Sequence, residues 1–359
     1  MFNSAFFRKF IIAFAVTFAL ISTIAAGAYA TMRTMIAPPE VPPLVAVPLP
    51  PERPVLNIGP TTDPSSEDTD DPEPVYEGDE PEVVALMNRR PNFFTFLLFG
   101  LDNSMQADAV MVGSIDMTSH EVNIISIPRD TLVDVNRRVR KISNGYASGR
   151  FGGRDHSSGV NQMKVEVSRL TGVMPDFYVQ VDFEAFTRVV DAIGGLTINI
   201  PFHMRYDDPY QNLSIDILPG EQLLLGEQAL HFVRFRQGNR GFTSITDYQR
   251  MENQQYLLTT LFSELLSPRT ILQIPEFLRI YSDHVNTDLS YRNMLWFATR
   301  LGGFNFNDFN THTLPIRGTS GAPGWYELPD RNGILELVNR TINPFEQDIV
   351  AGMLRIIDS

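Results

Sequence analysis

Charged residues of the types that handle phosphate gather at two places in the sequence. At the first place, Asp102 and Asp108 stand between two apolar runs, and Arg129 with Asp130 follows a third run, "IISIP". Arginine binds phosphate oxygens through two parallel hydrogen bonds and does not lose its charge. Two carboxylates suit a magnesium ion that takes its other ligands from phosphate oxygens and water. These residue types fit phosphoryl transfer, which depends on positioning and on charge neutralisation.

The second place lies further along the chain. Arg234 and Arg236 bracket a phenylalanine, and Asp247, Arg250 and Gln254 are spaced to share one face of a helix. Each piece alone has an ordinary explanation. An aspartate after a strand usually closes a turn, and a surface pair such as Asp247 with Arg250 contributes less than about 1 kcal/mol. It is the two groups together that indicate a site.

Three apolar runs must position the first group. Residues 93–102, "FFTFLLFGLD", fit a buried strand, and residues 108–116 and 122–127 flank the polar turn "MTSHE" as a β-hairpin would. Because a hairpin brings its open ends together, we expect Asp102, Asp108 and Arg129 at one edge of a sheet. Ligands of open α/β sheets commonly bind beyond strand ends.

Strands and helices alternate in the rest of the chain. Strands are expected over 176–183 and 196–201, and helices over 158–172, 184–195, 226–236, 247–268, 271–281, 291–303 and 332–342. This order predicts an α/β fold, a three-layer α/β/α domain with a mixed central sheet.

Composition excludes several function classes. The net charge of −13 and the lack of a basic stripe argue against nucleic-acid binding. The chain has no cysteine, which excludes disulfides, thiolate metal sites and cysteine nucleophiles. It also has no G-x-S-x-G motif and no histidine-rich segment, so serine-hydrolase and zinc chemistry are not indicated.

The N-terminal region predicts a membrane protein. Residues 10–32 carry no charge and are long enough to span a bilayer, and Arg8 and Lys9 place residues 1–9 in the cytoplasm. Residues 33–90 are rich in proline and acid and are expected to form a disordered or semi-rigid stalk. The alternative is a cleaved signal peptide ending at "AYA", residues 28–30. Both readings place the folded domain outside the cytoplasm, and the first predicts a single-pass protein of the cell membrane.

Seven segments in order resemble the LytR-CpsA-Psr family of cell-wall assembly enzymes. They are "LLFGLD", "ADAVMVGSID", "ISIPRDT", "KISNGYASG", "VDFEAFTRVVDAIGGLTINIP", "LPGEQLLLGEQALHFVRFR" and "DYQRMENQQ". The resemblance covers roughly residues 93–266, and "VNTDLSYRNML" is similar to the family's usual extension. It implies a catalytic domain over 91–345, with a motif-bearing core at 93–266 and a helical C-terminal extension at 267–345.

The resemblance also implies an activity. The family transfers a phosphorylated glycopolymer from a polyprenyl-pyrophosphate carrier to peptidoglycan, with magnesium. By motif, Asp102 and Asp108 would hold Mg2+. The residues implied to bind the pyrophosphate are Arg129, Arg234, Arg236, Arg250 and Gln254. The general base stays open between Asp108 and Asp130, and a further possibility is that metal and arginines suffice.

The chain departs from the family pattern at three positions. Gln106 and Asn253 stand where arginines are frequent, and Gln249 replaces a frequent glycine. The departures bring affinity or polymer preference into question more than the reaction. Two alternatives share the same residues: a non-catalytic scaffold that binds polyprenyl phosphate, and a pyrophosphatase on the same lipid.

Overall fold

The computed structural model describes residues 37–48, 84–102, 104–153, 155–209, 213–265, 285–301, 304, 309–320 and 325–357. The chain divides into two compact units. The first unit comprises Met1–Val41, Asn92–Arg129 and Pro175–Thr313, and the second comprises Pro42–Pro91, Asp130–Met174 and Leu314–Ser359.

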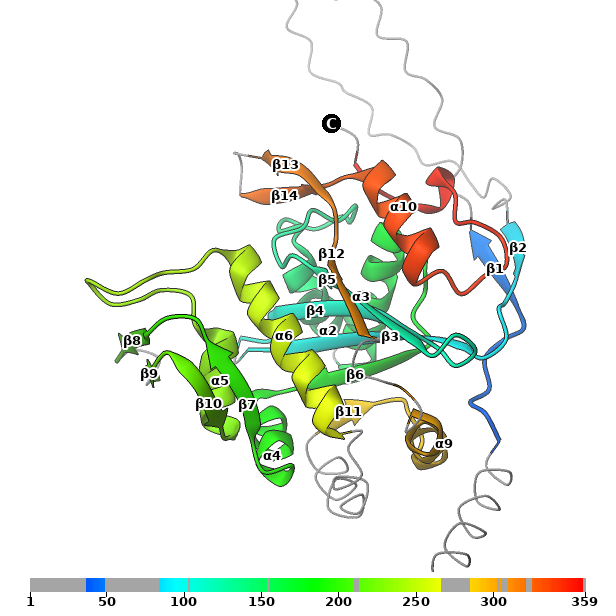
Figure 1. Ribbon diagram of the computed structural model, residues 1–359. Helices are drawn as coiled ribbons and strands as arrows, with labels where there is room; N and C mark the ends of the chain where they lie inside the picture. Colours follow the sequence, from blue (N-terminus) through cyan, green and yellow to red (C-terminus); the bar gives the residue numbers. More distant parts are fainter. Residues whose placement is uncertain are drawn as a thin grey trace, which may run out of the picture. The chain divides into compact units, whose positions relative to one another are not determined.

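The first unit is built on a six-stranded mixed sheet (Figure 1). Its strand order is β11-β6-β3-β4-β5-β12, and only the pairs β3 with β6 and β5 with β12 are parallel. The expected mixed central sheet is therefore confirmed. The strands are β3 (Phe93–Leu101), β4 (Ala107–Asp116), β5 (Glu121–Ile127), β6 (Phe177–Val181), β11 (Val285–Thr287) and β12 (Phe309–Thr313).

The hairpins of this sheet follow the apolar pattern. Seven of the nine residues of β3 are buried, as expected for a strand with both faces covered. The β3–β4 ladder ends at Leu101 opposite Ala107, and the β4–β5 ladder ends at Val110 opposite Ile127. The segments after β3, before β4 and after β5 therefore emerge at one edge of the sheet.

The helices of the first unit are α4 (Phe183–Ala192), α5 (Gly226–Arg234), α6 (Asp247–Leu265) and α9 (Tyr291–Leu301). Helix α6 crosses the sheet (Figure 1) and packs Leu258 and Phe262 against Met111 and Ile124. The Gln255 side chain fixes this position, because its amide donates to Ser126 Oγ at 2.9 Å and to a β12 carbonyl at 2.8 Å.

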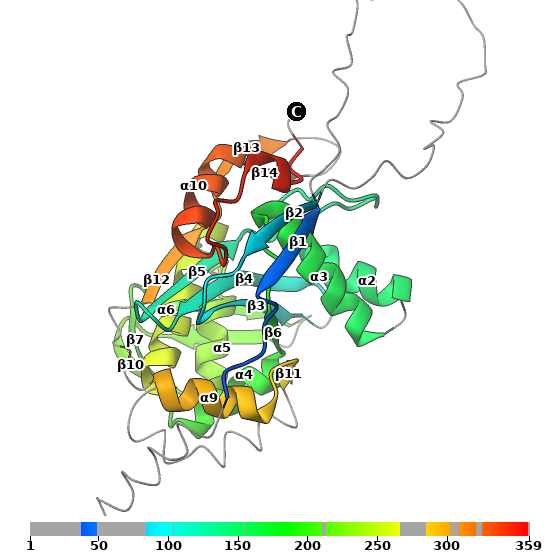
Figure 2. The ribbon, with the colours of Figure 1, turned by 90° about the vertical axis from the view of Figure 1, so that its right-hand side faces the viewer.

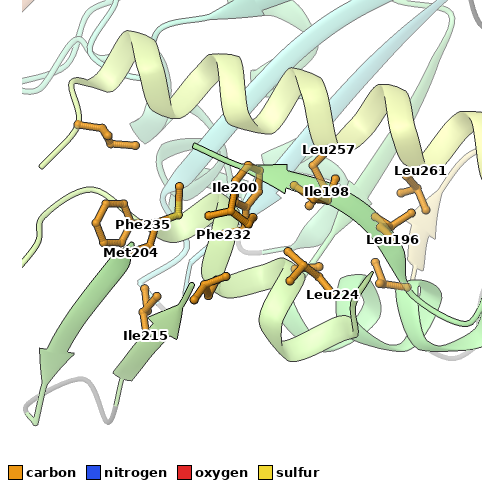
Figure 3. Close-up of a cluster of buried hydrophobic side chains, with 14 of the residues drawn as sticks. Leu196, Ile198, Ile200, Met204, Ile215, Leu224, Phe232, Phe235, Leu257 and Leu261 are labelled. Atoms are coloured by element: carbon orange, nitrogen blue, oxygen red, sulfur yellow. The ribbon is translucent and has the colours of Figure 1, made fainter. Parts of the chain in front are cut away.

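Two short ladders complete the first unit. Strand β7 (Leu196–Ile200) pairs with β10 (Gly220–Leu224), and β8 (Met204–Asp208) pairs with β9 (Leu213–Ile217). The expected strand at 196–201 thus exists, but it lies outside the central sheet. Its inward side chains join a buried cluster with α5 and α6, in which Leu257 and Leu261 lie beside Ile198 and Leu196 (Figure 3).

Glycine allows α4 and α5 to pack closely. A Cβ atom at Gly226, the first residue of α5, would overlap the carbonyl oxygen of Thr187 in α4. Asp182 caps α4, since its Oδ1 accepts a hydrogen bond from the Ala185 amide at 2.7 Å. These contacts set the spacing of the two helices.

The second unit combines short ladders with helices. Strand β1 (Leu44–Pro48) pairs with β2 (Val84–Asn88), and helix α2 (Gly145–Gly153) lies beside α3 (His156–Thr171) (Figure 2). Helix α3 ends at Gly172 in the left-handed conformation, as its sequence predicts. The remaining elements are η1 (Ile142–Asn144), β13 (Ile316–Ser320), β14 (Tyr326–Pro329), α10 (Arg331–Thr341) and η3 (Ala351–Met353).

Several expectations meet a different outcome. The segment 33–90 contains the paired strands β1 and β2 at its two ends, because the runs "LVAV" and "VAL" suit a ladder. The described part of 267–345 holds four strands besides α9 and α10, so it is not purely helical. The helix expected at 271–281 lies outside the described residues. The three-layer order and the domain boundaries stay predictions.

Within the part of the chain that the structure describes, no helix has the length and apolar character needed to cross a membrane. The membrane span expected at 10–32 lies outside that part.

Candidate functional site

The three residues predicted at one sheet edge do lie at the same hairpin end. Asp102 follows β3, Asp108 is the second residue of β4, and Arg129 follows β5 by two residues. Arg129 Nη1 donates to Asp108 Oδ1 at 3.0 Å, and both side chains are partly exposed. An ion pair with this exposure contributes little stability, so its main effect is to orient the guanidinium.

Asp102 closes the turn between β3 and β4. Its Oδ1 accepts hydrogen bonds from Ser104 N at 2.8 Å, Ser104 Oγ at 2.7 Å and Gln106 N at 2.9 Å. The turn needs this support because Met105 adopts a left-handed backbone with φ of 62°. The ordinary explanation of an aspartate after a strand therefore holds for one oxygen of Asp102. No bond from the described residues reaches its Oδ2.

Asp247 joins two arginines of the second group. Its Oδ2 lies 3.1 Å from Arg236 Nη2, and its Oδ1 lies 3.2 Å from Arg250 Nη2. Arg250 is only 8% exposed, so this is not the surface pair that its spacing alone would indicate. The shared carboxylate holds the two guanidiniums side by side despite their like charge.

The two groups form one electrostatic cluster. Burial lowers the pKa of Arg250 most, and the guanidinium of Arg129 lowers it further, whereas Asp247 and Asp108 raise it. Arg250 therefore feels charges from both places in the sequence. Its Nε is buried without a hydrogen-bond partner in the described residues, which leaves a donor available to a ligand.

Helix α6 starts with a capping box that fixes Asp247 and Arg250. Thr246 N donates to Gln249 Oε1 at 2.9 Å, and Gln249 N donates to Thr246 Oγ1 at 3.2 Å. Gln249, one of the three departures from the family pattern, thus stabilises the helix end that carries the cluster.

Arg234 is placed by α5. Phe235 is fully buried in the core, so Arg234 and Arg236 on either side of it turn away from that core. The Arg234 guanidinium lies over the Phe183 ring, 4.6 Å from its centroid. Both arginines line the cavity described next, as does Gln254.

A cavity of about 610 Å³ extends from the arginines between the sheet, the helices and the β8–β9 ladder. This volume lies in the range of ligand pockets. Its charged and amide-bearing lining is Asp108, Arg129, Asp182, Arg234, Arg236, Gln237, Arg250 and Gln254. Most of the rest is apolar and includes Leu98, Met111, Val179, Phe183, Phe186, Val189, Leu230, Val233, Leu257, Leu258, Leu261 and Phe262. The cavity is therefore amphiphilic.

The charged part of the cavity favours an anion. Four arginines line it, and three carboxylates, Asp108, Asp182 and Asp247, line it or pair with those arginines, so four minus three leaves a charge of +1. The whole chain has a net charge of −13. The surplus of positive charge is thus confined to the cavity. This is what we expect if an acidic chain binds an anionic ligand.

The acidic residues fit a magnesium ion only in part. Among the described residues, no group of three or more carboxylate or histidine side chains could hold a metal. Asp108 lines the cavity beside Arg129 and uses only Oδ1 in that pair, whereas Asp102 is not among the lining residues. Magnesium often takes one or two carboxylates and completes its octahedron with phosphate oxygens and water. Asp108 has the position and the chemistry for one such carboxylate ligand, whereas Asp102 lies outside the cavity lining, so the expected metal role of the pair stays a prediction.

Asp130 has a different setting from the other candidates. It belongs to the second unit, does not line the cavity, and pairs with Lys141 at 3.0 Å.

Sequence reasoning missed Lys141, Asp182 and the bridging role of Asp247. The cavity walls were missed too, because residues such as Val179 and Leu257 have the same pattern as core residues.

Comparisons with known proteins agree with this architecture. The family model described as the LytR_cpsA_psr family matches residues 62–341. "Regulatory protein MsrR" of Staphylococcus aureus is 25% identical over 232 residues, which cover 63% of this chain and 65% of MsrR. "Polyisoprenyl-teichoic acid--peptidoglycan teichoic acid transferase TagU" of Bacillus subtilis is 28% identical over 272 residues, which cover 74% of this chain and 81% of TagU. The chain thus spans slightly less than two thirds of MsrR and about four fifths of TagU.

The crystal structure of B. subtilis TagV has the same fold, with a TM-score of 0.58 and 24% identity over 70% of this chain and 96% of that one. The family model covers most of the chain, and the fold that it shares with TagV agrees with this match. The chain belongs to the LytR-CpsA-Psr family.

Proposed function

We propose that the protein transfers a phosphorylated glycopolymer from a polyprenyl-pyrophosphate carrier to peptidoglycan at the outer face of the cell membrane. The observation that carries the proposal is the amphiphilic cavity, in which four arginines adjoin apolar walls. A ligand that matches it has an anionic head and a long hydrocarbon tail. Family membership and the printed name of TagU support the choice of substrate and acceptor.

The arginines would bind the pyrophosphate. Arg250 is held by Asp247 and offers a buried Nε, and Arg129 is oriented by Asp108. Guanidinium forks bind phosphate oxygens bidentately, and in a site with little water each contact is stronger than at the surface. The apolar walls from α4, α5 and α6 would take the first part of the polyprenyl tail and exclude water from the reacting phosphate.

The reaction would balance as a phosphoryl transfer. A hydroxyl oxygen of peptidoglycan bonds to the phosphorus that carries the glycopolymer, and the bond from that phosphorus to the bridging oxygen breaks. Polyprenyl phosphate leaves with the bridging electrons. The hydroxyl proton passes to a base, for which Asp108 and Asp130 are the candidates. Asp108 lines the cavity, whereas Asp130 already pairs with Lys141.

Asp102 and Asp108 would hold a magnesium ion together with phosphate oxygens. When bound, the ion would neutralise charge on the pyrophosphate. The arginines share this task, since Arg129 and Arg250 lie within electrostatic range of each other and of Asp108.

The scaffold alternative gains support from one observation. The Asp102 carboxylate has a structural use in the β3–β4 turn, so its presence alone does not require a metal. A scaffold would bind the carrier and leave it unchanged.

Lipid analysis tests the binding part of the proposal. Full-length protein is purified from membranes, extracted, and examined by mass spectrometry for polyprenyl phosphates. We expect such a lipid with the wild type and much less with Arg250→Ala, while Arg188→Ala, at an exposed arginine of α4 that pairs with Glu184, keeps it. Equal lipid in all three proteins, or none in the wild type, would contradict the proposal.

A further inference from the structure

The β8–β9 ladder and the loop between α5 and α6 both contribute to the cavity. Tyr206 of β8 and Leu213 of β9 line it, and so do Arg236 and Gln237 at the start of the loop. The loop covers residues 237–246 and extends toward β8 and β9 (Figure 1). It ends at Asp247, whose carboxylate pairs with Arg236. Both ends of the loop therefore lie in the electrostatic cluster of the site.

The base of this loop is fixed by contacts of its own. Ile245 N donates to the Arg236 carbonyl at 2.8 Å, and the Ile245 side chain belongs to the buried cluster of α5 and α6. The Arg236 side chain is held by Asp247 at 3.1 Å. Residues 238–243, which form the tip of the loop, make a separate set of contacts with β8.

Asn239 at the tip closes the free edge of β8. This strand pairs with β9 along one edge. On the other edge, Asn239 N donates to the Arg205 carbonyl at 2.9 Å, and Asn239 Oδ1 accepts a hydrogen bond from Asp207 N at 3.1 Å. Asn239 Nδ2 also donates to Asp207 Oδ2 at 3.0 Å. We call these three bonds the latch; they satisfy backbone groups that an open strand edge would leave unpaired.

Phe242 adds an aromatic contact next to the latch. Its ring meets the His203 ring edge to face at 5.1 Å between centroids, and the Arg205 guanidinium carbon lies 5.7 Å from the Phe242 centroid. Phe242 N donates to the Asn239 carbonyl at 2.8 Å. The aromatic contact and the latch therefore belong to the same turn of the loop.

Strand β8 needs such a contact more than β9 does. Three side chains anchor β9 in the buried cluster, at Leu213, Ile215 and Ile217, whereas in β8 the one fully buried side chain is Met204. Side chains alternate along β8, so Tyr206 lines the cavity while its neighbours in the strand are exposed. The position of Tyr206 thus depends on the pairing of β8 with β9 and on the latch.

We propose that Asn239 is a positioning residue, which through the latch keeps β8 and Tyr206 in the wall that encloses the hydrocarbon tail of the ligand. The inference rests on the proposed function, in which the ligand is a tailed pyrophosphate. Enclosure of a tail contributes affinity in proportion to the apolar area removed from water. Inorganic pyrophosphate has no tail, so its binding should not depend on the latch.

Calorimetric titration with two ligands tests the positioning role. Full-length protein in lipid nanodiscs is titrated with farnesyl pyrophosphate, against empty nanodiscs as reference, and with inorganic pyrophosphate. Asn239→Ala should weaken farnesyl pyrophosphate binding by about 2- to 12-fold, the range for loss of one net hydrogen bond. It should leave inorganic pyrophosphate binding unchanged, because the contacts of Arg236 with Ile245 and Asp247 do not involve Asn239.

Exchange of the two partners makes the test specific. Asn239→Asp sets two carboxylates against each other and should weaken farnesyl pyrophosphate binding at least as much as Asn239→Ala. Adding Asp207→Asn to that variant restores one amide and one carboxylate with their roles exchanged, and should restore the affinity. Ser214→Ala is the matched control, because Ser214 Oγ donates to Asp207 Oδ1 at 2.7 Å within the β8–β9 ladder rather than across the latch. It should change neither affinity.

Three results would each overturn the inference: unchanged farnesyl pyrophosphate affinity in both single Asn239 variants, equal losses for both ligands, or a loss in Ser214→Ala as large as in Asn239→Ala. Failure of the proposed function looks different. The wild type itself would then bind farnesyl pyrophosphate no more tightly than inorganic pyrophosphate, which would mean that the cavity holds no tail.

Discussion

Replacing Arg250 by lysine should make anion binding fall at alkaline pH, which the wild type should not show. Arg250 is 8% exposed, and its pKa is lowered by burial and then by the Arg129 guanidinium, with a further contribution from Arg236. A guanidinium starts from a pKa so high that it stays charged in this setting. A lysine starts from about 10.4, so the same surroundings bring its loss of charge into the accessible pH range.

The size of the effect follows from the contact that is lost. A charge-assisted hydrogen bond to phosphate contributes about 1.5–3 kcal/mol, which corresponds to roughly 10- to 150-fold in affinity. Above the pKa of the new lysine, the affinity of Arg250→Lys for the anion should fall by nearly this factor. At pH 7 the fall should be smaller, because the lysine keeps its charge and lacks only the planar fork of arginine.

The stability of the Arg250→Lys variant should depend on pH with the opposite sign to its anion binding. The unfolded lysine binds its proton up to about pH 10.4, whereas the folded lysine loses it earlier, so the unfolded state binds more protons in this window. The unfolding free energy of Arg250→Lys relative to wild type should therefore rise with pH there, by about 1.4 kcal/mol for each unit by which folding lowers the lysine pKa.

Calorimetric titration with inorganic pyrophosphate between pH 7 and 10 measures the binding effect, and urea unfolding measures the stability effect. Taking the ratio of variant to wild type at each pH removes the titration of pyrophosphate itself. Arg188→Lys is the control, since this exposed arginine pairs with Glu184 four residues away and its ratio should stay flat. A flat ratio for Arg250→Lys as well would refute the role of Arg250 in anion binding.

Three further predictions concern the cavity and its two ends. Asp247→Asn should lower the unfolding free energy by about 1–3 kcal/mol in urea titrations, because two guanidiniums lose their shared carboxylate; unchanged stability would mean that the pairs contribute nothing. Phe186→Trp should fill part of the cavity and weaken binding of polyprenyl pyrophosphate but not of inorganic pyrophosphate, and an equal effect on both ligands would argue against a tail-binding role. Asp102→Ala should lower the melting temperature as well as magnesium-dependent turnover, since its turn loses three hydrogen bonds. Asp108→Ala should lower turnover and leave the melting temperature nearly unchanged, so equal melting temperatures in the two variants would contradict the turn role of Asp102.

Sequence reasoning succeeds where a local pattern decides the structure. The apolar run of β3, the polar turn after β4 and the glycine that ends α3 each follow from neighbouring residues, and they place Asp102, Asp108 and Arg129 at one edge. The strands it misses are short and partly polar. The β12 sequence "FNTHT", for example, forms a strand because it pairs with β5, far away in the chain.

The environment of the site could not be derived in the same way. Arg250 is buried and feels the charge of Arg129, which follows β5, as well as that of Asp247 in its own helix, and i, i+3 spacing fits an exposed pair equally well. The cavity wall at Leu257 is indistinguishable from core in a sequence, because both need only an apolar side chain at helical spacing. The bond from Glu327 to Asp130 joins residues almost 200 positions apart and has no local signal.

A transfer assay in oxygen-18 water tests the central claim most directly. Full-length protein in nanodiscs receives polyprenyl-pyrophosphate-linked glycopolymer, Mg2+ and purified peptidoglycan, and muramidase digests are analysed by mass spectrometry. We predict glycopolymer joined to peptidoglycan through a phosphodiester without oxygen-18, together with released polyprenyl phosphate. Oxygen-18 in free phosphorylated polymer would identify a pyrophosphatase, and intact carrier that stays bound would identify a scaffold; either result would contradict the transferase.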